Sequence, residues 1–162
     1  MKFTCSQKDL KNALNLVNRA VSGRSTLPVL NNVLIEVGEG KIRLATTNLE
    51  VAIIHWIQGK IKSEGAVTVP VKLLAQYISL LNDGEIQVEL LEGETLSLKS
   101  DSSDTKIKGI NSDDFPSISQ LEDGTQLEIS STDLQEAIKQ VSFAAALDET
   151  RPVLAGVYLK TG

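Results

Sequence analysis

The chain has 162 residues, of which 41% are hydrophobic and 23% are charged, a balance typical of soluble globular proteins. Its single cysteine, Cys5, excludes an internal disulfide, and no stretch approaches the ~20 consecutive apolar residues of a membrane-spanning helix. The N-terminal residues soon reach Gln7, Lys8 and Asp9, so they lack the apolar segment of a signal peptide. We therefore expect a cytoplasmic protein with no membrane partner.

The net charge of −5 masks two segments of opposite sign. Residues 1–24 carry five basic side chains and one acidic side chain, whereas residues 83–104 carry seven acidic side chains and one basic side chain. A protein that is acidic overall can still bind a polyanion through one basic face. The charge counts alone fit two ordinary solvated faces equally well.

The first part of the chain is predicted to form a strand, a helix and three strands. A short alternating strand over residues 3–5 leads into a helix over residues 7–21, for which Ser6 is a suitable N-cap. The apolar residues of this helix recur at helical spacing, while Lys8 and Lys11 lie on a different, polar face. The three strands are predicted over residues 29–37, 41–46 and 50–61.

The same order of elements is predicted again 64 positions later. A strand over residues 66–69 leads through Pro70 into a helix over residues 71–81, whose polar face includes Lys72. Two such strand–helix–three-strand units favour an α+β fold with the helices on one face of antiparallel sheet. The strands of the second unit are predicted over residues 85–91, 95–100 and 104–110.

A longer internal repeat has a shift of 124 positions. Residues 3–38 align without a gap with residues 127–162, and 12 of the 36 pairs are identical, where unrelated sequences would give roughly 2. Residues 111–124 have the composition of a linker, with Pro116 and Gly124 among serine and aspartate residues. We therefore expect a complete first domain over residues 1–120, a linker over 121–126, and the truncated start of a second, like domain over 127–162.

The sequence carries no signature of catalysis or of a metal site. His55 is the only histidine and lies within a predicted strand, so no Cys/His ligand set can form. Cys5 has no sequence neighbour that would favour a thiolate, and the acidic pair Asp113 and Asp114 lies in the Pro-containing linker. No glycine-rich phosphate loop follows a strand. We therefore expect no catalytic residue, no metal and no cofactor.

The lysines on the predicted helices are the strongest candidates for ligand binding. Lysines spaced along a helix without aromatic residues between them suit contact with phosphates better than stacking on bases, and such contacts are independent of sequence. For either helix alone, an ordinary solvated face is the alternative. The repeat favours binding, because like domains would place their helix faces in equivalent positions.

Four short motifs resemble those of one family. They are MKFT at residues 1–4, GRSTLPVLNN at 23–32, TNLE at 47–50 and DFP at 114–116. In these motifs the chain resembles the bacterial sliding clamp family, the beta subunits of DNA polymerase III. The resemblance extends over the whole chain in order.

This resemblance implies an architecture and a function. Members of the family have three like domains, each a doubled strand–helix–strand unit, and two chains close head to tail into a ring. Helices line the hole and face duplex DNA, while sheets form the outside. The implied function is a processivity factor without an active site. The implied partners are duplex DNA, the polymerase catalytic subunit, the clamp loader and a second copy of the protein.

The resemblance also implies roles for individual residues. Arg24 matches the family's loop arginine that reaches the DNA backbone, and Lys8, Lys11 and Lys72 lie on the helices that would face the hole. Leu154 matches a leucine of the cleft that receives peptide motifs of the polymerase and the clamp loader. The ring-closing edge would be the last strand of the first domain, with Thr105, Lys106, Ile107 and Lys108.

Two segments depart from the family pattern. Residues 147–150 include Asp148 and Glu149 where relatives can present a polar, DNA-facing residue. The strand over residues 104–110 lacks the arginine and phenylalanine that some relatives place at the ring-closing interface. The alternative function is a protein-docking scaffold of repeated α+β domains that does not bind DNA, and an enzyme domain is a more distant third.

Overall fold

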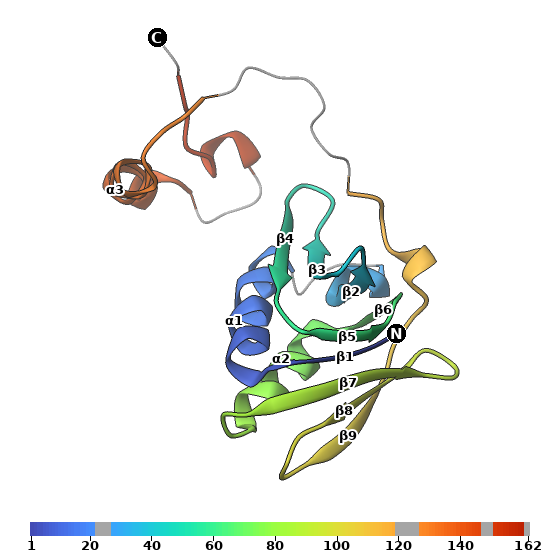
Figure 1. Ribbon diagram of the computed structural model, residues 1–162. Coiled ribbons are helices and arrows are strands. Elements are labelled where there is room, and N and C mark those ends of the chain that lie inside the picture. The colour runs from blue at the N-terminus through green and yellow to red at the C-terminus, as the bar shows by residue number, and fades with distance from the viewer. Residues whose placement is uncertain (22–26, 119–126, 147–150, 161–162) are drawn as a thin grey trace. The chain divides into compact units, whose positions relative to one another are not determined.

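The computed structural model describes residues 1–21, 27–118, 127–146 and 151–160. Its contacts divide the chain into two compact units, Met1–Ser119 and Gln120–Gly162 (Figure 1). No helix among the described residues is long and apolar enough to cross a membrane.

Within its described residues, the first unit has two α-helices and nine strands in two repeated segments. Apart from one additional strand, β5, this is the order of elements predicted from the sequence. The first segment consists of β1 (Lys2–Ser6), α1 (Gln7–Val17), β2 (Asn32–Gly38), β3 (Lys41–Thr47), β4 (Ala52–Ile57) and β5 (Lys60–Ser63). The second consists of β6 (Gly65–Pro70), α2 (Val71–Leu80), β7 (Glu85–Leu91), β8 (Thr95–Lys99) and β9 (Asp104–Lys108).

Each segment contributes its first strand to the sheet of the other segment. The five-stranded sheet has the order β5-β1-β7-β8-β9, and the four-stranded sheet has the order β4-β3-β2-β6. β1 pairs antiparallel with β7, with Phe3 opposite Val88, and β6 pairs antiparallel with β2, with Val67 opposite Ile35. The two segments therefore form one folding unit, because separating them would break both sheets.

The single strand predicted over residues 50–61 is wrong, because this segment forms two strands in different sheets. The chain passes from β4 to β5 through Gln58 and Gly59. A Cβ at Gly59 would lie 2.6 Å from Ile42 Cδ1 and 2.7 Å from the carbonyl oxygen of Thr4, so glycine is required there. The chain therefore passes close to both β3 and β1 where it changes sheets.

Two other predicted boundaries also differ. The strand predicted from residue 29 begins at Asn32, because Pro28 starts a 3₁₀ helix over Pro28–Asn31. The helix predicted over residues 7–21 is α-helical only to Val17 and continues as a 3₁₀ helix over Asn18–Ala20.

One hydrophobic core is shared by both sheets and both helices. α1 contacts α2 directly and also packs on β3 and β4, while α2 packs on β2 and β6. The apolar face of each helix is buried in the same cluster as the inward side chains of both sheets. The buried apolar residues of the helices are Leu10, Ala13, Leu14 and Val17 in α1, and Val71, Leu74 and Ile78 in α2.

Part of the segment predicted as a linker is folded onto the first unit. Ser112–Asp114 forms a 3₁₀ helix, and Phe115 is buried against Leu34 and Ala45 in a second, smaller apolar cluster on the four-stranded sheet. Burial of an aromatic ring outweighs the loop-forming composition around it. A linker starting at residue 111 is therefore wrong. Residues 121–126 lie outside the described residues.

The second unit repeats the start of the first. Its helix α3 (Ser131–Val141) and the 3₁₀ helix Ser142–Ala144 lie 124 positions after α1 and the 3₁₀ helix that follows α1. Ser130 caps α3 in the same way that Ser6 caps α1. In this unit, the residues that match the buried face of α1 are half-buried or exposed, namely Leu134, Ile138 and Val141.

Candidate nucleic-acid interface

Two side chains fix the start of α1 and its position beside α2. The hydroxyl oxygen of Ser6 accepts a hydrogen bond of 3.4 Å from the backbone N–H of Asp9, which confirms the predicted N-cap. The side-chain amide of the buried Gln7 donates to the carbonyl oxygens of Ile78 at 2.7 Å and Leu81 at 3.3 Å. The first residue of α1 therefore holds the C-terminal end of α2, and the two helices form one layer.

The predicted binding lysines lie on the solvent side of this helical layer. Lys8 in α1 and Lys72 in α2 are exposed, and Lys11 in α1 is half-buried. Because the apolar faces of both helices enter the same core, their lysine-bearing faces point away from both sheets. The structure thus places the three lysines on one helical layer.

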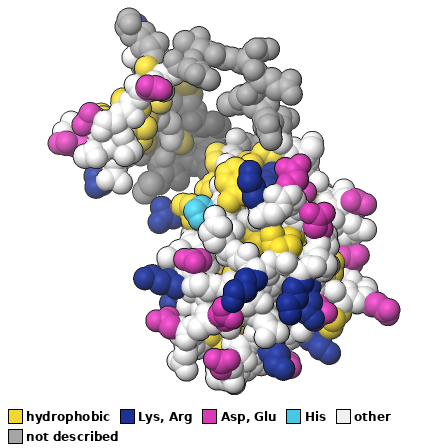
Figure 2. All heavy atoms as spheres, viewed as in Figure 1, with side chains coloured by type: hydrophobic (Ala, Val, Ile, Leu, Met, Phe, Trp, Pro, Cys, Tyr) yellow, Lys and Arg dark blue, Asp and Glu magenta, His cyan; other side chains and the backbone are white. Residues whose placement is uncertain are grey.

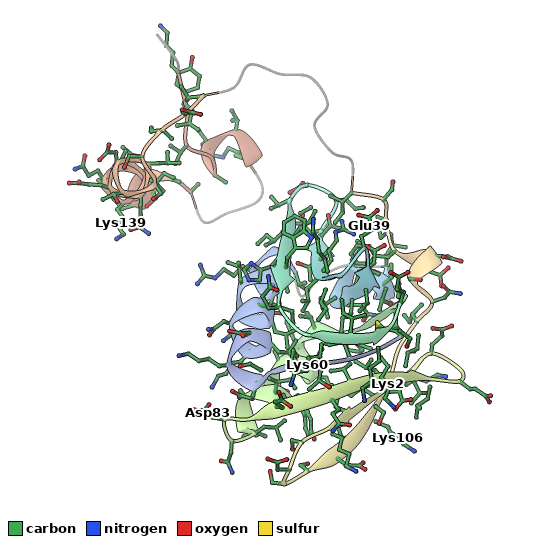
Figure 3. The ribbon with its side chains drawn as sticks, in the orientation of Figure 1. Lys2, Glu39, Lys60, Asp83, Lys106 and Lys139 are labelled. Carbon is green, nitrogen blue, oxygen red and sulfur yellow. The ribbon has the colours of Figure 1, made fainter. Side chains whose placement is uncertain are left out.

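The described helical layer has a single acidic side chain, whereas the strands carry side chains of both signs that pair with one another. In the described helical segments α1, Asn18–Ala20 and α2, the single acidic residue is Asp9, against four basic residues. On the strands, Lys2 pairs with Glu89 at 2.8 Å and Lys60 pairs with Glu85 at 3.2 Å. Figure 3 labels Lys2 and Lys60 on the first unit. Figure 2 shows basic and acidic side chains interspersed over one face of the first unit. The three helix lysines have no ion pair among the described residues.

Two arginines complete the set of basic residues near the start of the chain, and only one of them was predicted to contact DNA. Arg24 lies outside the described residues, so its contact with DNA stays a prediction. Arg19 is exposed in the 3₁₀ helix directly after α1. It follows Lys8 by eleven residues, which is about three helical turns and places both on one side of the helix. That spacing could have identified Arg19 from the sequence.

A family model described as DNA polymerase III beta subunit, N-terminal domain, matches residues 1–119. The chain belongs to this family. It is 36% identical over 168 residues to the beta sliding clamp of Synechocystis sp. and 35% identical over 163 residues to that of Synechococcus elongatus. Each match covers 99% of this chain and 43% of the relative, so the chain spans less than half the length of these relatives.

Solved structures of beta subunits have the same fold. The DNA polymerase III subunit beta from Pseudomonas aeruginosa matches with a TM-score of 0.86 at 30% identity, over 95% of this chain and 42% of that chain. The beta subunit from Streptococcus pyogenes also matches with a TM-score of 0.86, at 28% identity, over 94% of this chain and 42% of that chain. The family resemblance and the α+β clamp fold inferred from the sequence are confirmed.

The residues predicted to close the beta subunit ring lie on β9, an edge strand of the five-stranded sheet. Thr105 and Ile107 pair with β8 residues of the core, and Ile107 is buried with 5% of its surface exposed. The side chain of Ile107 faces the core, and the role of these four residues in closing the ring stays a prediction. Lys106 and Lys108 are exposed, and Lys108 Nζ donates to the carbonyl oxygen of Gly93. Among the described strands, β9 pairs with β8 alone, which leaves its other edge open.

The candidate residue of the peptide-binding cleft lies in the second unit. Leu154 is in the 3₁₀ helix Pro152–Leu154, with 50% of its surface exposed. Its role in binding partner peptides stays a prediction. The acidic residues Asp148 and Glu149 lie outside the described residues.

Cys5 and His55, which were considered as catalytic or metal-binding residues, lie within the fold without a chemical partner for either role among the described residues. Burial, with a smaller contribution from the charge of Asp9, raises the pKa of Cys5 to about 12, so this thiol stays neutral at physiological pH. His55 is half-buried on β4. Across the described ranges, no three His, Cys, Asp or Glu side chains come together as metal ligands.

Proposed function

We propose that this chain is part of a DNA sliding clamp of DNA polymerase III, in which α1 and α2 face duplex DNA. The observation that carries the proposal is the helical layer, with Lys8, Lys11 and Lys72 on its solvent side and Asp9 as its single acidic residue. Membership in the beta subunit family supports it. In this function the protein encircles DNA and tethers the polymerase, and it catalyses no reaction itself.

The chemistry of the helical layer suits a protein that slides. Ammonium groups neutralise phosphates and displace their counterions, and these contacts carry no sequence information. Hydrogen bonds to base edges would instead favour particular positions on the DNA and hinder movement. Residues 83–104, which carry seven acidic side chains and one basic side chain, repel DNA, and this favours approach from the side of the helices.

We further propose the domain organisation and partners of the whole protein. Residues 1–120 form one clamp domain, residues 121–126 a linker, and residues 127–162 the start of a second domain, a division supported by the repeat of α1 in α3. Arg24 contacts the DNA backbone, Leu154 contributes to a cleft for partner peptides, and the edge of β9 joins a second copy in a homodimeric ring. The partners are the polymerase catalytic subunit and the clamp loader, in the cytoplasm.

The proposal is tested by replacing Lys8, Lys11 and Lys72 with glutamine in the full-length protein. The measurement is the equilibrium affinity for circular duplex DNA at several salt concentrations. Each phosphate contact contributes about 0.9 to the slope of log K against log salt concentration, so the slope should fall by about 2 to 3. Lys8 and Lys72 are exposed and Lys11 is half-buried, so thermal unfolding is measured to check that the variant keeps its fold.

A matched triple variant provides the control, because it removes the same charge from the strands. An equal loss of slope in both variants would contradict the assignment of the helical layer. Failure of the unmodified full-length protein to show salt-dependent retention on circular duplex DNA would favour a docking scaffold that does not bind DNA. The control replaces the exposed Lys41, Lys62 and Lys99 of β3, β5 and β8 with glutamine.

A further inference from the structure

Trp56, the only tryptophan of the chain, lies at an exposed position on the edge of the four-stranded sheet. Its side chain is 56% exposed, whereas the next residue of β4, Ile57, is 6% exposed and belongs to the core. Because side chains alternate along a strand, the indole ring points to the face opposite the core. A large aromatic side chain that is exposed to solvent on a rigid strand is typical of a surface that binds a partner.

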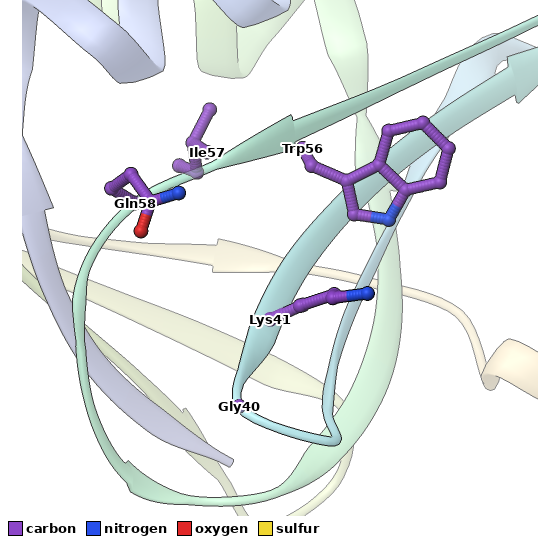
Figure 4. A pocket seen from close by; sticks show the side chains of 5 residues that line it. All are labelled: Gly40, Lys41, Trp56, Ile57 and Gln58. Atoms are coloured by element: carbon purple, nitrogen blue, oxygen red, sulfur yellow. The ribbon is translucent and has the colours of Figure 1, made fainter.

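A pocket opens directly beside this indole ring. It has a volume of about 340 Å³ and is lined by Gly40, Lys41, Trp56, Ile57 and Gln58 (Figure 4). The turn between β2 and β3 makes the space, because Gly40 has a φ of +73° and no atom lies within 4 Å of where a Cβ would be. The pocket is therefore built by the turn and by the end of β4.

Trp56 and Lys41 contribute hydrogen-bond donors to this pocket, and the side-chain amide of Gln58 contributes both a donor and an acceptor. Figure 4 shows the indole nitrogen of Trp56 and Nζ of Lys41 ending on the same side of the pocket. Within the described residues, neither group has a hydrogen-bond or ion-pair partner. The neighbouring Arg43, opposite Trp56 in register, is already paired with Glu36 at 2.7 Å. A carboxylate would accept hydrogen bonds from both open donors, and no acidic side chain lines the pocket.

The surroundings of the pocket disfavour a polyanion. Glu36 lies on β2, and Glu64 Oε1 accepts a hydrogen bond of 3.2 Å from the backbone N–H of Glu39 at the turn. A second hollow, which shares Trp56 with this pocket, is lined by Asp9. Successive phosphates would meet these carboxylates, whereas a single carboxylate beside Lys41 would not.

We propose that this pocket binds a short peptide segment of a partner protein, in which an aliphatic residue adjoins an acidic one. The aliphatic side chain packs on the exposed indole ring of Trp56, and the carboxylate accepts hydrogen bonds from Lys41 Nζ and Trp56 Nε1. This site goes beyond the proposed DNA contact, because it uses none of the lysines of the helical layer. Its test therefore succeeds or fails independently of DNA binding.

The test uses the fluorescence of Trp56, because no other residue of the chain gives tryptophan emission. The probe is an acetylated and amidated hexapeptide with one leucine followed by one aspartate in a glycine–serine background. We expect saturable binding with a dissociation constant of about 0.1 to 1 mM and a shift of emission to shorter wavelength. A peptide with asparagine in place of aspartate should bind about three- to tenfold more weakly.

Single-residue variants locate the binding. The Lys41→Gln variant should weaken binding of the aspartate peptide about three- to tenfold and leave the asparagine peptide unaffected. The Lys62→Gln variant is the matched control on β5 and should bind as the unmodified chain does. Calorimetric titration of Trp56→Phe should show weaker binding of both peptides, since the phenyl ring lacks the indole N–H.

Three outcomes would overturn the proposal. One is the absence of any saturable change with the aspartate peptide at millimolar concentration. Another is equal binding of the aspartate and asparagine peptides, which would remove the carboxylate from the site. The third is a response to oligothymidylate but not to the peptide, which would assign the indole ring to base stacking instead.

Discussion

The side-chain amide of Gln7 donates a hydrogen bond of 2.7 Å to the carbonyl oxygen of Ile78, and so joins the start of α1 to the end of α2. Ile78 lies in the last turn of α2, where its carbonyl oxygen also accepts a hydrogen bond of 3.4 Å from the backbone N–H of the C-cap residue Leu81. The backbone N–H of Gln7 also donates to the carbonyl oxygen of Gly84 at 2.8 Å. One residue of the first segment therefore completes the C-terminal end of the helix in the second.

The Gln7→Ala substitution is expected to lower the free energy of unfolding by about 1 to 3 kcal/mol. It removes the donor for two carbonyl oxygens at a position with 2% exposure. Urea-induced unfolding measures the change. The neighbouring Lys8→Ala is the control and should change stability by less than about 0.5 kcal/mol. Similar values for both variants would show that the Gln7 amide does not stabilise the helix pair.

The Gly109→Ala substitution is expected to lower the free energy of unfolding by about 2 kcal/mol or more, because no space exists for the added methyl group. A Cβ at Gly109 would clash with the carbonyl oxygen of Thr68 and lie 3.0 Å from that of Glu94. Thr68 and Ile110 exchange backbone hydrogen bonds of 2.9 and 3.1 Å, which the methyl group would disrupt. The control is Gly38→Ala, where nothing lies within 4 Å, and a comparable loss there would contradict the steric explanation.

The Cys5 thiol is expected to react with a disulfide reagent at pH 8 only when the chain unfolds. Its pKa is raised to about 12 by burial and, to a smaller extent, by Asp9, so the thiolate is scarce in the folded state. The absorbance of the released aromatic thiol measures the rate with and without denaturant. Fast labelling of the folded chain would contradict the burial of Cys5.

The same thiol should make stability depend on alkaline pH. The thiol of the unfolded chain has a pKa of about 8.5. Below that pH the thiol is neutral in both states, and its burial does not lower the stability of the fold. Stability is lost as the pH rises from there towards the folded-state pKa of about 12. Thermal unfolding between pH 7 and 10 should therefore show a smaller decline for Cys5→Ala than for the unmodified chain.

The Leu49→Gly substitution is expected to raise the melting temperature by about 2 to 4 °C, equivalent to about 1 kcal/mol. Leu49 has a φ of +77°, a region that favours glycine, and its side chain is 62% exposed, so little packing is lost. Leu49→Ala keeps the unfavourable φ and should change stability little. A decrease in melting temperature for Leu49→Gly would show that the exposed leucine makes a stabilising contact.

Much of the local structure could be predicted because it depends on neighbouring residues. The N-cap at Ser6 and the apolar spacing of α1 are properties of a few adjacent turns. The internal repeat also predicted that Ser131–Val141 would match α1. The same periodicity predicted the lysine-bearing faces, since the polar face of an amphipathic helix lies opposite its apolar face.

The positions that could not be predicted depend on residues distant in sequence. Nothing near Phe115 shows that it packs on Leu34, and nothing near Gln58 and Gly59 shows that the chain there changes sheets. In both cases a loop-like or strand-like local pattern was outweighed by tertiary contacts. Ile107 is a similar case, because the strand was predictable but the face that enters the core was not.

The α+β composition, the doubled strand–helix–strand order and the lysine-bearing faces of two helices follow from local sequence, because periodicity and capping act over a few residues. The pairing of β1 with the sheet of the second segment, and of β6 with that of the first, is visible in the folded structure alone. The folded structure also decided that Gln7 completes α2 and that Trp56 faces solvent. Which strands pair depends on the burial of apolar side chains across the whole core, so it cannot be read from the residues near each strand.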